Sequence, residues 1–388
     1  MRLTSAPHRS ALLLAAVFAV VSAHAQPVVV DLHPAAWMPD AGAELKFSQP
    51  ADARRGALTV RHGGAVLRGV DFTDGTIDFD IREEPDNEGI PGVWFHRRDA
   101  QVAENVYLRT DAGCPASIEC VQYAPVAHGN VQWDVYPEFQ AAAPVHATGW
   151  NHVRLVISGR RMQVFVNAQA APSLVVGRLE GDAASGGLQL WGDATYANVV
   201  LEPGAVAGLD PRPQSDPTAG DLNFLREWRL APVGQLARGQ SLALADEPAS
   251  PQDWPALSAE RKGFVNLGRA HGTTVGTPDL AWLHAYIDAD KDQVRRVSLG
   301  WAREVWVFVN GKPVFVAQNA YYPSSARKGL GRMDLSDGGF NLPLRAGHND
   351  IELAISDDLQ SSHHYGWGFV WKFDQTTGLH LPPPPSGM

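Results

Sequence analysis

The chain has 388 residues, of which 45% are hydrophobic, so it can bury a large core and is too apolar for a disordered protein. Its length predicts two domains, and its 37 Gly and 28 Pro favour turn-rich β architecture over helical bundles. The formal net charge of −10 gives no broad positive surface for phosphate backbones, so we expect no nucleic-acid partner.

Residues 1–25 have the pattern of a secretory signal peptide. Arg2 and Arg9 precede an apolar run at 11–21, and small residues stand where cleavage after Ala25 requires them. The run is too short to span a bilayer, and no later segment is long and uncharged enough, so no membrane span is expected. The sequence therefore predicts a periplasmic or secreted protein. Losing the two arginines would change its net charge from −10 to −12.

Alternating apolar and polar residues predict the strands of the first half. Such runs occur at 76–81, 152–157 and 162–166, separated by clusters of Gly, Pro, Asp and Asn. An alternating run is typical of a strand that buries one face, and short strands with frequent turns favour antiparallel sandwiches. The sequence predicts an all-β fold with two β-sandwich (jelly-roll) domains in tandem.

The two cysteines, Cys114 and Cys120, enclose a short loop. In an oxidising compartment a disulfide is their simplest role, and closing this ring would contribute about 2 kcal/mol to stability. A metal site is the alternative, but the sequence offers no second cysteine pair and no histidine pair at ligand spacing. We expect the disulfide.

The domain boundary is predicted where the sequence becomes too rich in Pro and Gly to continue a strand. Beyond it, 305–309 and 314–316 flank an Asn-Gly pair that is typical of a tight hairpin. The run 365–373 places five aromatic residues on one strand face, which is typical of a sandwich core, with an exposed sugar platform as the alternative. The predicted units are the first sandwich at 26–202, a linker at 203–221, the second sandwich at 222–374 and a Pro-rich tail at 375–388.

Both halves resemble known families in the order of short motifs. The first half carries these at 92–97, 104–109, 121–123, 150–156 and 164–167. Over 31–201 it resembles the laminin-G-like, concanavalin-type jelly roll and, more narrowly, the 3-keto-disaccharide hydrolase-like family. The second half, at 305–311 and 344–353, is similar to the galactose-binding-like sandwich found with many secreted glycoside hydrolases. Both resemblances imply a carbohydrate ligand, and neither implies catalysis by itself, because both folds also host lectins and interaction modules.

The first resemblance implies a binding site on the concave face of the jelly roll. In a strand, Tyr107 and Arg109 would point the same way and offer a stacking ring and a fork of donors for vicinal hydroxyls or a carboxylate. Glu104 would point to the opposite face. An ordinary sheet surface is the alternative reading. The positions that match the family's motifs are Glu104, Tyr107, Arg109, Gln122 and Tyr123.

Trp133 is a further candidate for ligand binding. It lies in a polar segment, so its ring either stacks on the C–H side of a pyranose or anchors a loop on the sandwich. Trp191 has the pattern of a strand residue, and the sequence assigns it no further role.

Catalysis of glycoside hydrolysis needs two carboxylates across the scissile bond. Residues 84–88 have the E-x-D-x-E spacing of one jelly-roll glucanase family, but their Pro and Asn favour a turn, so we expect a solvated acidic loop. Calcium binding through Asp86 and Glu88 is the alternative there. Glu104 and Asp78 are the remaining weak candidates for proton transfer, although Asp78 also fits a polar outer strand face.

The sequence predicts no required cofactor. The adjacent His363 and His364 would face opposite ways in a strand, which disfavours a shared metal. The motifs of serine hydrolases, zinc proteases and nucleotide-binding loops do not occur. Three functions stay open: an exported carbohydrate-binding protein, which we favour, a secreted hydrolase of glycosides or 3-keto-glycosides, and a non-catalytic interaction module of the envelope. The sugar and the oligomeric state are not predicted.

Overall fold

The computed structural model describes residues 26–40, 42–84, 90–110, 113–237, 239–274, 276–319, 331–357 and 365–382. Strands dominate it, as the sequence predicts, and the described part contains a single short α-helix, α1 (Leu267–Ala270). Three short 3-10 helices accompany it: η1 (Leu244–Asp246), η2 (Pro251–Asp253) and η3 (Arg261–Gly263). No helix among the described residues is long and apolar enough to cross a membrane.

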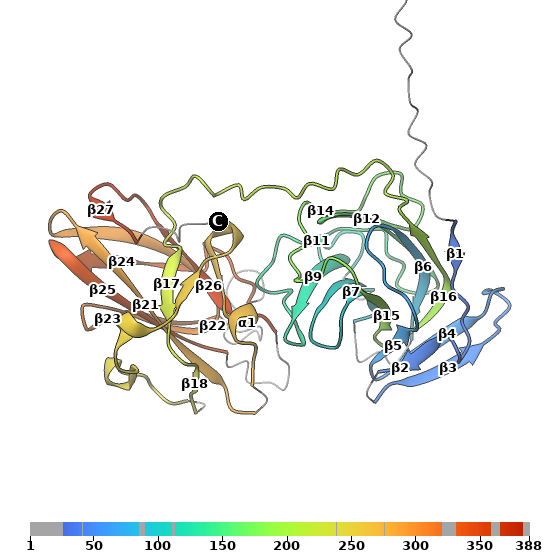
Figure 1. Ribbon diagram of the computed structural model, residues 1–388, viewed down its shortest axis with the longest axis horizontal. Coiled ribbons are helices and arrows are strands. Elements are labelled where there is room, and N and C mark those ends of the chain that lie inside the picture. The colour runs from blue at the N-terminus through green and yellow to red at the C-terminus, as the bar shows by residue number, and fades with distance from the viewer. Residues whose placement is uncertain are drawn as a thin grey trace, which may run out of the picture.

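The first half is a sandwich of two antiparallel sheets (Figure 1). Sheet A has the order β14 (Leu174–Val176), β13 (Arg161–Val166), β12 (Asn151–Ser158), β6 (Gly75–Glu83), β16 (Ala194–Pro203), β4 (Ala57–Arg61) and β3 (Glu44–Ser48), with β1 (Val28–Val29) beside β16. Sheet B has the order β10 (Asn130–Val131), β9 (Val121–Ala127), β8 (Ala103–Leu108), β7 (Gly92–Arg97), β15 (Gly187–Trp191), β5 (Gly64–Leu67) and β2 (Trp37–Pro39), with β11 (Gln140–Ala141) beside β9.

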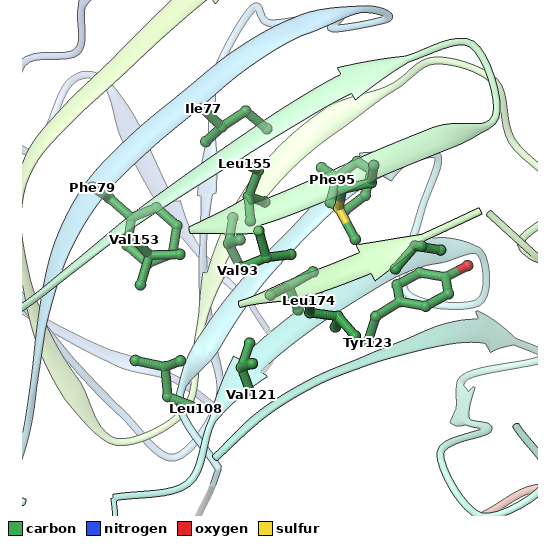
Figure 2. Close-up of a cluster of buried hydrophobic side chains, with 14 of the residues drawn as sticks. Ile77, Phe79, Val93, Phe95, Leu108, Val121, Tyr123, Val153, Leu155 and Leu174 are labelled. Carbon is green, nitrogen blue, oxygen red and sulfur yellow. The ribbon is translucent and has the colours of Figure 1, made fainter. Parts of the chain in front are cut away.

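The core of this sandwich follows from the alternation in its strands. Ile77 and Phe79 of β6 and Val153 and Leu155 of β12 point inward and are almost fully buried. They meet inward residues of sheet B such as Phe95 (Figure 2). The interleaved polar residues lie on the outer faces, where they are free to pair with each other or with a ligand.

The second half forms one continuous hydrogen-bonded sheet folded around its own core. The order is β19 (Ala256–Ser258), β17 (Glu227–Leu230), β21 (Asp279–Ala289), β25 (Gly347–Ser356), β22 (Gln293–Val309), β26 (Gly368–Phe373) and β20 (Phe264–Asn266). β18 (Gly234–Gln235) and β27 (Leu379–His380) pair with β21, and β23 (Lys312–Asn319) and β24 (Gly338–Leu344) pair with β22.

The long strand β22 belongs to both layers of the second sandwich. Its first part pairs with β24 and β26, and its second part pairs with β23 and β25. The change of layer falls at Arg303, whose φ is 89°. Between β22 and β23, Asn310 and Gly311 both have positive φ, which confirms the predicted tight hairpin.

The aromatic run of the second half is core, as its alternation predicts. Trp367, Phe369, Trp371 and Phe373 are all at most 1% exposed. Tyr365, the first of the five aromatics, is only partly buried and faces the first sandwich, where it pairs with Val131 as an isolated β-bridge.

The two sandwiches are joined by an extended segment that follows β16 (Figure 1). They also touch directly, because Phe264, Met333 and Val370 of the second sandwich pack against the core of the first. Polar contacts cross the same boundary: the Arg303 guanidinium donates to the buried Asp134 carboxylate. The predicted domain limits themselves remain a prediction.

Candidate functional site

The outer face of sheet B is the best candidate site. In β8, Val106 and Leu108 point into the core, so Asn105 and Tyr107 point to the outer face. Strand register places Gln189 and Trp94 in the cross-strand row of Asn105. The next row holds Trp191 of β15, Tyr107 of β8, Gln122 of β9 and Gln140 of β11. We call Trp94, Asn105, Tyr107, Gln122 and Gln189 the sheet B row set.

Four side chains of the sheet B row set leave a polar atom open. The buried Trp94 Nε1, Asn105 Oδ1, Gln122 Oε1 and Gln189 Oε1 have no hydrogen-bond partner among the described residues. The two glutamines use their other amide atom: Gln122 Nε2 donates to Gln140 Oε1 at 3.0 Å, and Gln189 Nε2 donates to Asp40 Oδ2 at 3.2 Å. A buried polar group without a partner costs about 1–3 kcal/mol, and this face carries four such groups among the described residues.

Aromatic rings accompany these open atoms. The rings of Trp94 and Trp191 stack with their centroids 5.0 Å apart, and Trp191 is only partly buried. Tyr107 is buried on the same face, and this burial raises the pKa of its phenol. Rings beside open donors and acceptors form the kind of surface that holds a sugar ring.

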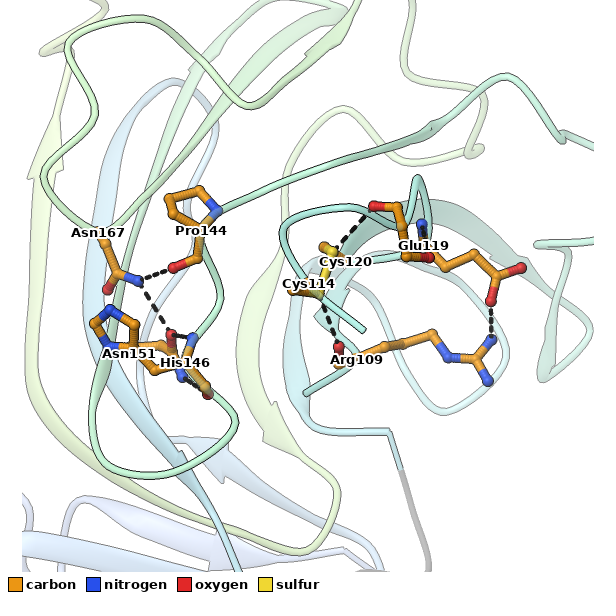
Figure 3. The surroundings of a disulfide bond; sticks show 9 residues. Arg109, Cys114, Glu119, Cys120, Pro144, His146, Asn151 and Asn167 are labelled. Atoms are coloured by element: carbon orange, nitrogen blue, oxygen red, sulfur yellow. Dashed lines mark hydrogen bonds and ion pairs between the residues drawn. A yellow bond between two sulfur atoms is a disulfide. The ribbon is translucent and has the colours of Figure 1, made fainter. Parts of the chain in front are cut away.

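Arg109 lies at the end of this face, beside the disulfide loop. The disulfide between Cys114 and Cys120 is present, as predicted, and closes the loop that carries Glu119 (Figure 3). Arg109 Nη1 lies 3.4 Å from Glu119 Oε2, and Arg332 Nη1 of the second sandwich lies 2.9 Å from Glu119 Oε1. One carboxylate thus bridges two guanidinium groups.

Trp133 packs between the two sandwiches. The Arg332 guanidinium lies over its ring, 5.0 Å from the centroid, and the Tyr365 ring meets it edge-on at 5.4 Å. One face of the Trp133 ring is therefore occupied by a cation. This arrangement favours the anchoring role of Trp133 over an open stacking platform.

Tyr123 and Glu104 lie on the opposite side of sheet B. The expectation that Tyr123 shares a face with Tyr107 is corrected, because Tyr123 is 1% exposed within the core (Figure 2). Its hydroxyl donates to Glu104 Oε2 at 2.7 Å and accepts from the Glu180 amide. Burial raises the pKa of Glu104 to about 8. Glu104 faces away from Tyr107, as the alternation predicts.

Asp78 lies on the other sheet, so it cannot act together with Glu104. It faces outward from sheet A, where Arg154 Nε donates to Asp78 Oδ1 at 2.7 Å and His152 Nε2 lies 3.2 Å away. Burial raises the pKa of Asp78, but the hydrogen bonds from His152 and Arg154 outweigh it, and the net shift is downward. A carboxylate held ionised in this way suits a polar outer face.

A cleft of about 540 Å³ lies between the sandwiches, next to the sheet B row set. Its wall includes Gln140, the partner of Gln122, and Arg332. Two of its four carboxylates are paired as follows: Arg261 binds Glu180 at 2.8 Å, and the Tyr136 hydroxyl donates to Glu260 at 2.7 Å. Apolar side chains line part of the wall, namely Ile118, Val135, Phe264, Met333, Leu335 and Val370.

The described residues contain no group of three or more His, Cys, Asp or Glu side chains that could hold a metal ion. The calcium candidates Asp86 and Glu88, and the pair His363 and His364, lie outside the described residues.

No protein-family model matches the chain, and no curated protein matches it by sequence. Solved structures that match include the carbohydrate-binding module CBM66 of Bacillus subtilis, with 16% identity, 41% of this chain and 95% of that chain covered and a TM-score of 0.30. A putative glycosyl hydrolase of Parabacteroides distasonis matches with 14% identity, 46% and 100% coverage and a TM-score of 0.32. A Bacillus subtilis protein with a galectin-like fold matches with 14% identity, 46% and 95% coverage and a TM-score of 0.30. We draw no functional conclusion from likeness at this level.

Several residues of the site have no strong signal in the sequence. Trp94 stands between Val93 and Phe95, so it reads as one more core residue of a buried strand. Asn105 and Gln189 alternate with apolar neighbours, which indicates an outer face but not an unpaired one. Arg332 comes from the second sandwich, and only the packing of the two halves brings it to the site.

Proposed function

We propose that this protein is an exported carbohydrate-binding protein that holds a glycan on the outer face of sheet B. The observation that carries the proposal is the set of four buried polar atoms, on four adjacent strands, that have no partner among the described residues. The predicted signal peptide and the disulfide between Cys114 and Cys120 support export.

Sugar chemistry matches this face. The open atoms are three amide oxygens and one indole N–H, and a sugar hydroxyl can donate to the first and accept from the second. The partly buried Trp191 ring supplies an apolar surface for the C–H side of a pyranose. Each hydroxyl that binds would remove the free-energy penalty of an unpaired buried atom, so binding gains more here than on a satisfied surface.

The test is a glycan array probed with the mature protein, followed by calorimetric titration with the oligosaccharides that bind. Trp191→Ala should weaken binding about 10- to 30-fold, since an aromatic anchor is lost. Trp150→Ala is the matched control, because Trp150 is also partly buried but lies beside sheet A under Arg82. Absence of binding across the array would refute the proposal, and equal effects of the two variants would refute the site.

A hydrolase is the second candidate, favoured by one observation. Glu180 and Glu260 line the same cleft, and burial raises the pKa of Glu180. A general acid and a second carboxylate in one cleft are the minimum for glycoside hydrolysis. The test incubates each oligosaccharide that binds with the wild-type protein and, separately, with Glu180→Gln. If Glu180 is catalytic, the wild type releases hydrolysis products and the variant does not.

A further inference from the structure

Three arginines gather in the region where Arg332 meets Trp133. Arg109, Arg303 and Arg332 bring three guanidinium groups, which face the carboxylates of Glu119 and Asp134.

Arg332 is built into the site. It is 6% exposed, with its guanidinium between the Trp133 ring and Glu119, and it lines the cleft between the sandwiches. Its Nη1 binds Glu119, whereas its buried Nη2 has no partner in the described part of the chain. Arg303 Nη1, which is also buried, is likewise open among the residues described. Guanidinium N–H groups without a partner can donate hydrogen bonds to a ligand, and the strongest hydrogen-bond acceptor for them is an anion.

This cationic group adjoins the sheet B row set. Arg109 follows Tyr107 by two positions, so both start from the same face of the sheet. The Tyr107 phenol is close enough for the charges of Arg109 and Arg332 to lower its pKa against the larger, opposite effect of burial. A sugar on the outer face of sheet B would therefore have its next unit, or a substituent, within reach of Arg332.

We propose that the site selects acidic glycans, with the carboxylate of a uronate unit bound by Arg332 at the mouth of the cleft. This inference rests on the proposed function and names its ligand class. Glu119 acts as the internal competitor, because it holds the same guanidinium that the uronate carboxylate would engage. The apolar wall of the cleft can accept the C–H face of that unit.

The experiment titrates wild-type protein with tri-uronides of galacturonate, glucuronate and mannuronate and with their methyl esters, which keep the shape and remove the charge. At least one acid should bind about 10- to 100-fold more tightly than its ester, because charge-assisted hydrogen bonds are lost in the ester. Raising the salt concentration should weaken binding of the acid more than that of the ester.

Two substitutions with opposite expected signs test the residue assignment. Arg332→Gln should abolish the preference for the acid, and Glu119→Gln should strengthen binding of the acid several-fold, since it frees Nη1 for a two-pronged contact. Arg154→Gln on sheet A, which changes the same residue type away from the site, should leave the preference unchanged. If Arg332→Gln fails to fold, the affinity of Glu119→Gln for the acids and the affinity of wild type for the esters still test the proposal.

The outcomes separate the two proposals. Equal binding of acids and esters, or tight binding of neutral oligosaccharides alone, would overturn the acidic-glycan inference and leave the carbohydrate-binding proposal standing. Absence of binding for every neutral and acidic glycan would overturn both. A loss of acid binding in Glu119→Gln would also overturn the inference, because it would give Glu119 a supporting role instead of a competing one.

Discussion

Two polar clusters on the outer faces of the first sandwich differ in how their hydrogen-bonding groups are paired. On sheet A, Asp78 binds Arg154 and His152, and Asp80 accepts from His152 Nδ1 at 2.8 Å and from Asn198 Nδ2 at 2.6 Å. These groups form a closed network in which each carboxylate has at least two partners. On sheet B, four side chains that are at most 4% exposed leave a polar atom without a partner among the described residues.

Under the proposed function, the polar groups of sheet A stabilise the fold, whereas those of sheet B bind a ligand. Both faces come from the same alternation of apolar and polar residues, so a sequence pattern treats them alike. A network in which every polar group has a hydrogen-bond partner stabilises the fold. Buried polar atoms without a partner destabilise the fold, and they are retained where a ligand supplies the missing hydrogen bond. Removing a polar group should therefore lower the free energy of unfolding on sheet A and raise it on sheet B.

The largest expected effect is the loss of a carboxylate from the closed network. Asp78→Ala should lower the free energy of unfolding by about 2 kcal/mol, because it leaves the Arg154 and His152 side chains without their shared acceptor. Denaturant unfolding followed by fluorescence measures the change, with Asp71→Ala, at an exposed carboxylate, as the control. Glycan binding should not change. Equal stability of the two variants would show that the network is not a structural one.

On sheet B the same kind of measurement should give the opposite sign. Asn105→Leu should raise the free energy of unfolding by about 1 kcal/mol, because it removes a buried acceptor that has no partner within the described residues, and it should weaken glycan binding about tenfold. The matched control is Asn151→Leu of sheet A, whose buried amide exchanges two hydrogen bonds with the His146 backbone. That control should be destabilised. A destabilised Asn105→Leu would contradict the comparison.

Much of the fold could be predicted because it depends on local patterns. Alternation places Ile77 and Phe79 in the core, and the Asn-Gly pair at 310–311 forms its hairpin. The disulfide follows from the short spacing of Cys114 and Cys120 in a chain whose sequence predicts export. Each of these features is decided within a few residues, so no knowledge of distant contacts is needed.

The site depends on contacts that no local pattern encodes. Gln122 and Tyr123 are neighbours in sequence, but adjacent strand residues face opposite ways, so only Gln122 shares a face with Tyr107. The family motif includes both Gln122 and Tyr123 and does not indicate which of them points to the outer face. Trp133 likewise looks like a free ring in the sequence, because the Arg332 guanidinium over it comes from the other sandwich. Long-range packing decided these points.

The smallest expected effect is a pH dependence that belongs to sheet A alone. Hydrogen bonds to Asp78 and then to Asp80 raise the pKa of His152 to about 9, above its value in the unfolded chain. Protonated His152 therefore stabilises the fold fully below about pH 6.5, and this contribution is lost as the pH rises through about 9. Because the imidazole is nearly half exposed, we expect less than about 1 kcal/mol. The unfolding free energies of wild type and His152→Gln, measured from pH 6 to pH 10, should converge at high pH. Glycan affinity of the two proteins should stay equal throughout, since His152 lies on the sheet opposite the proposed site, and a difference in affinity that followed the same titration would place the glycan on sheet A.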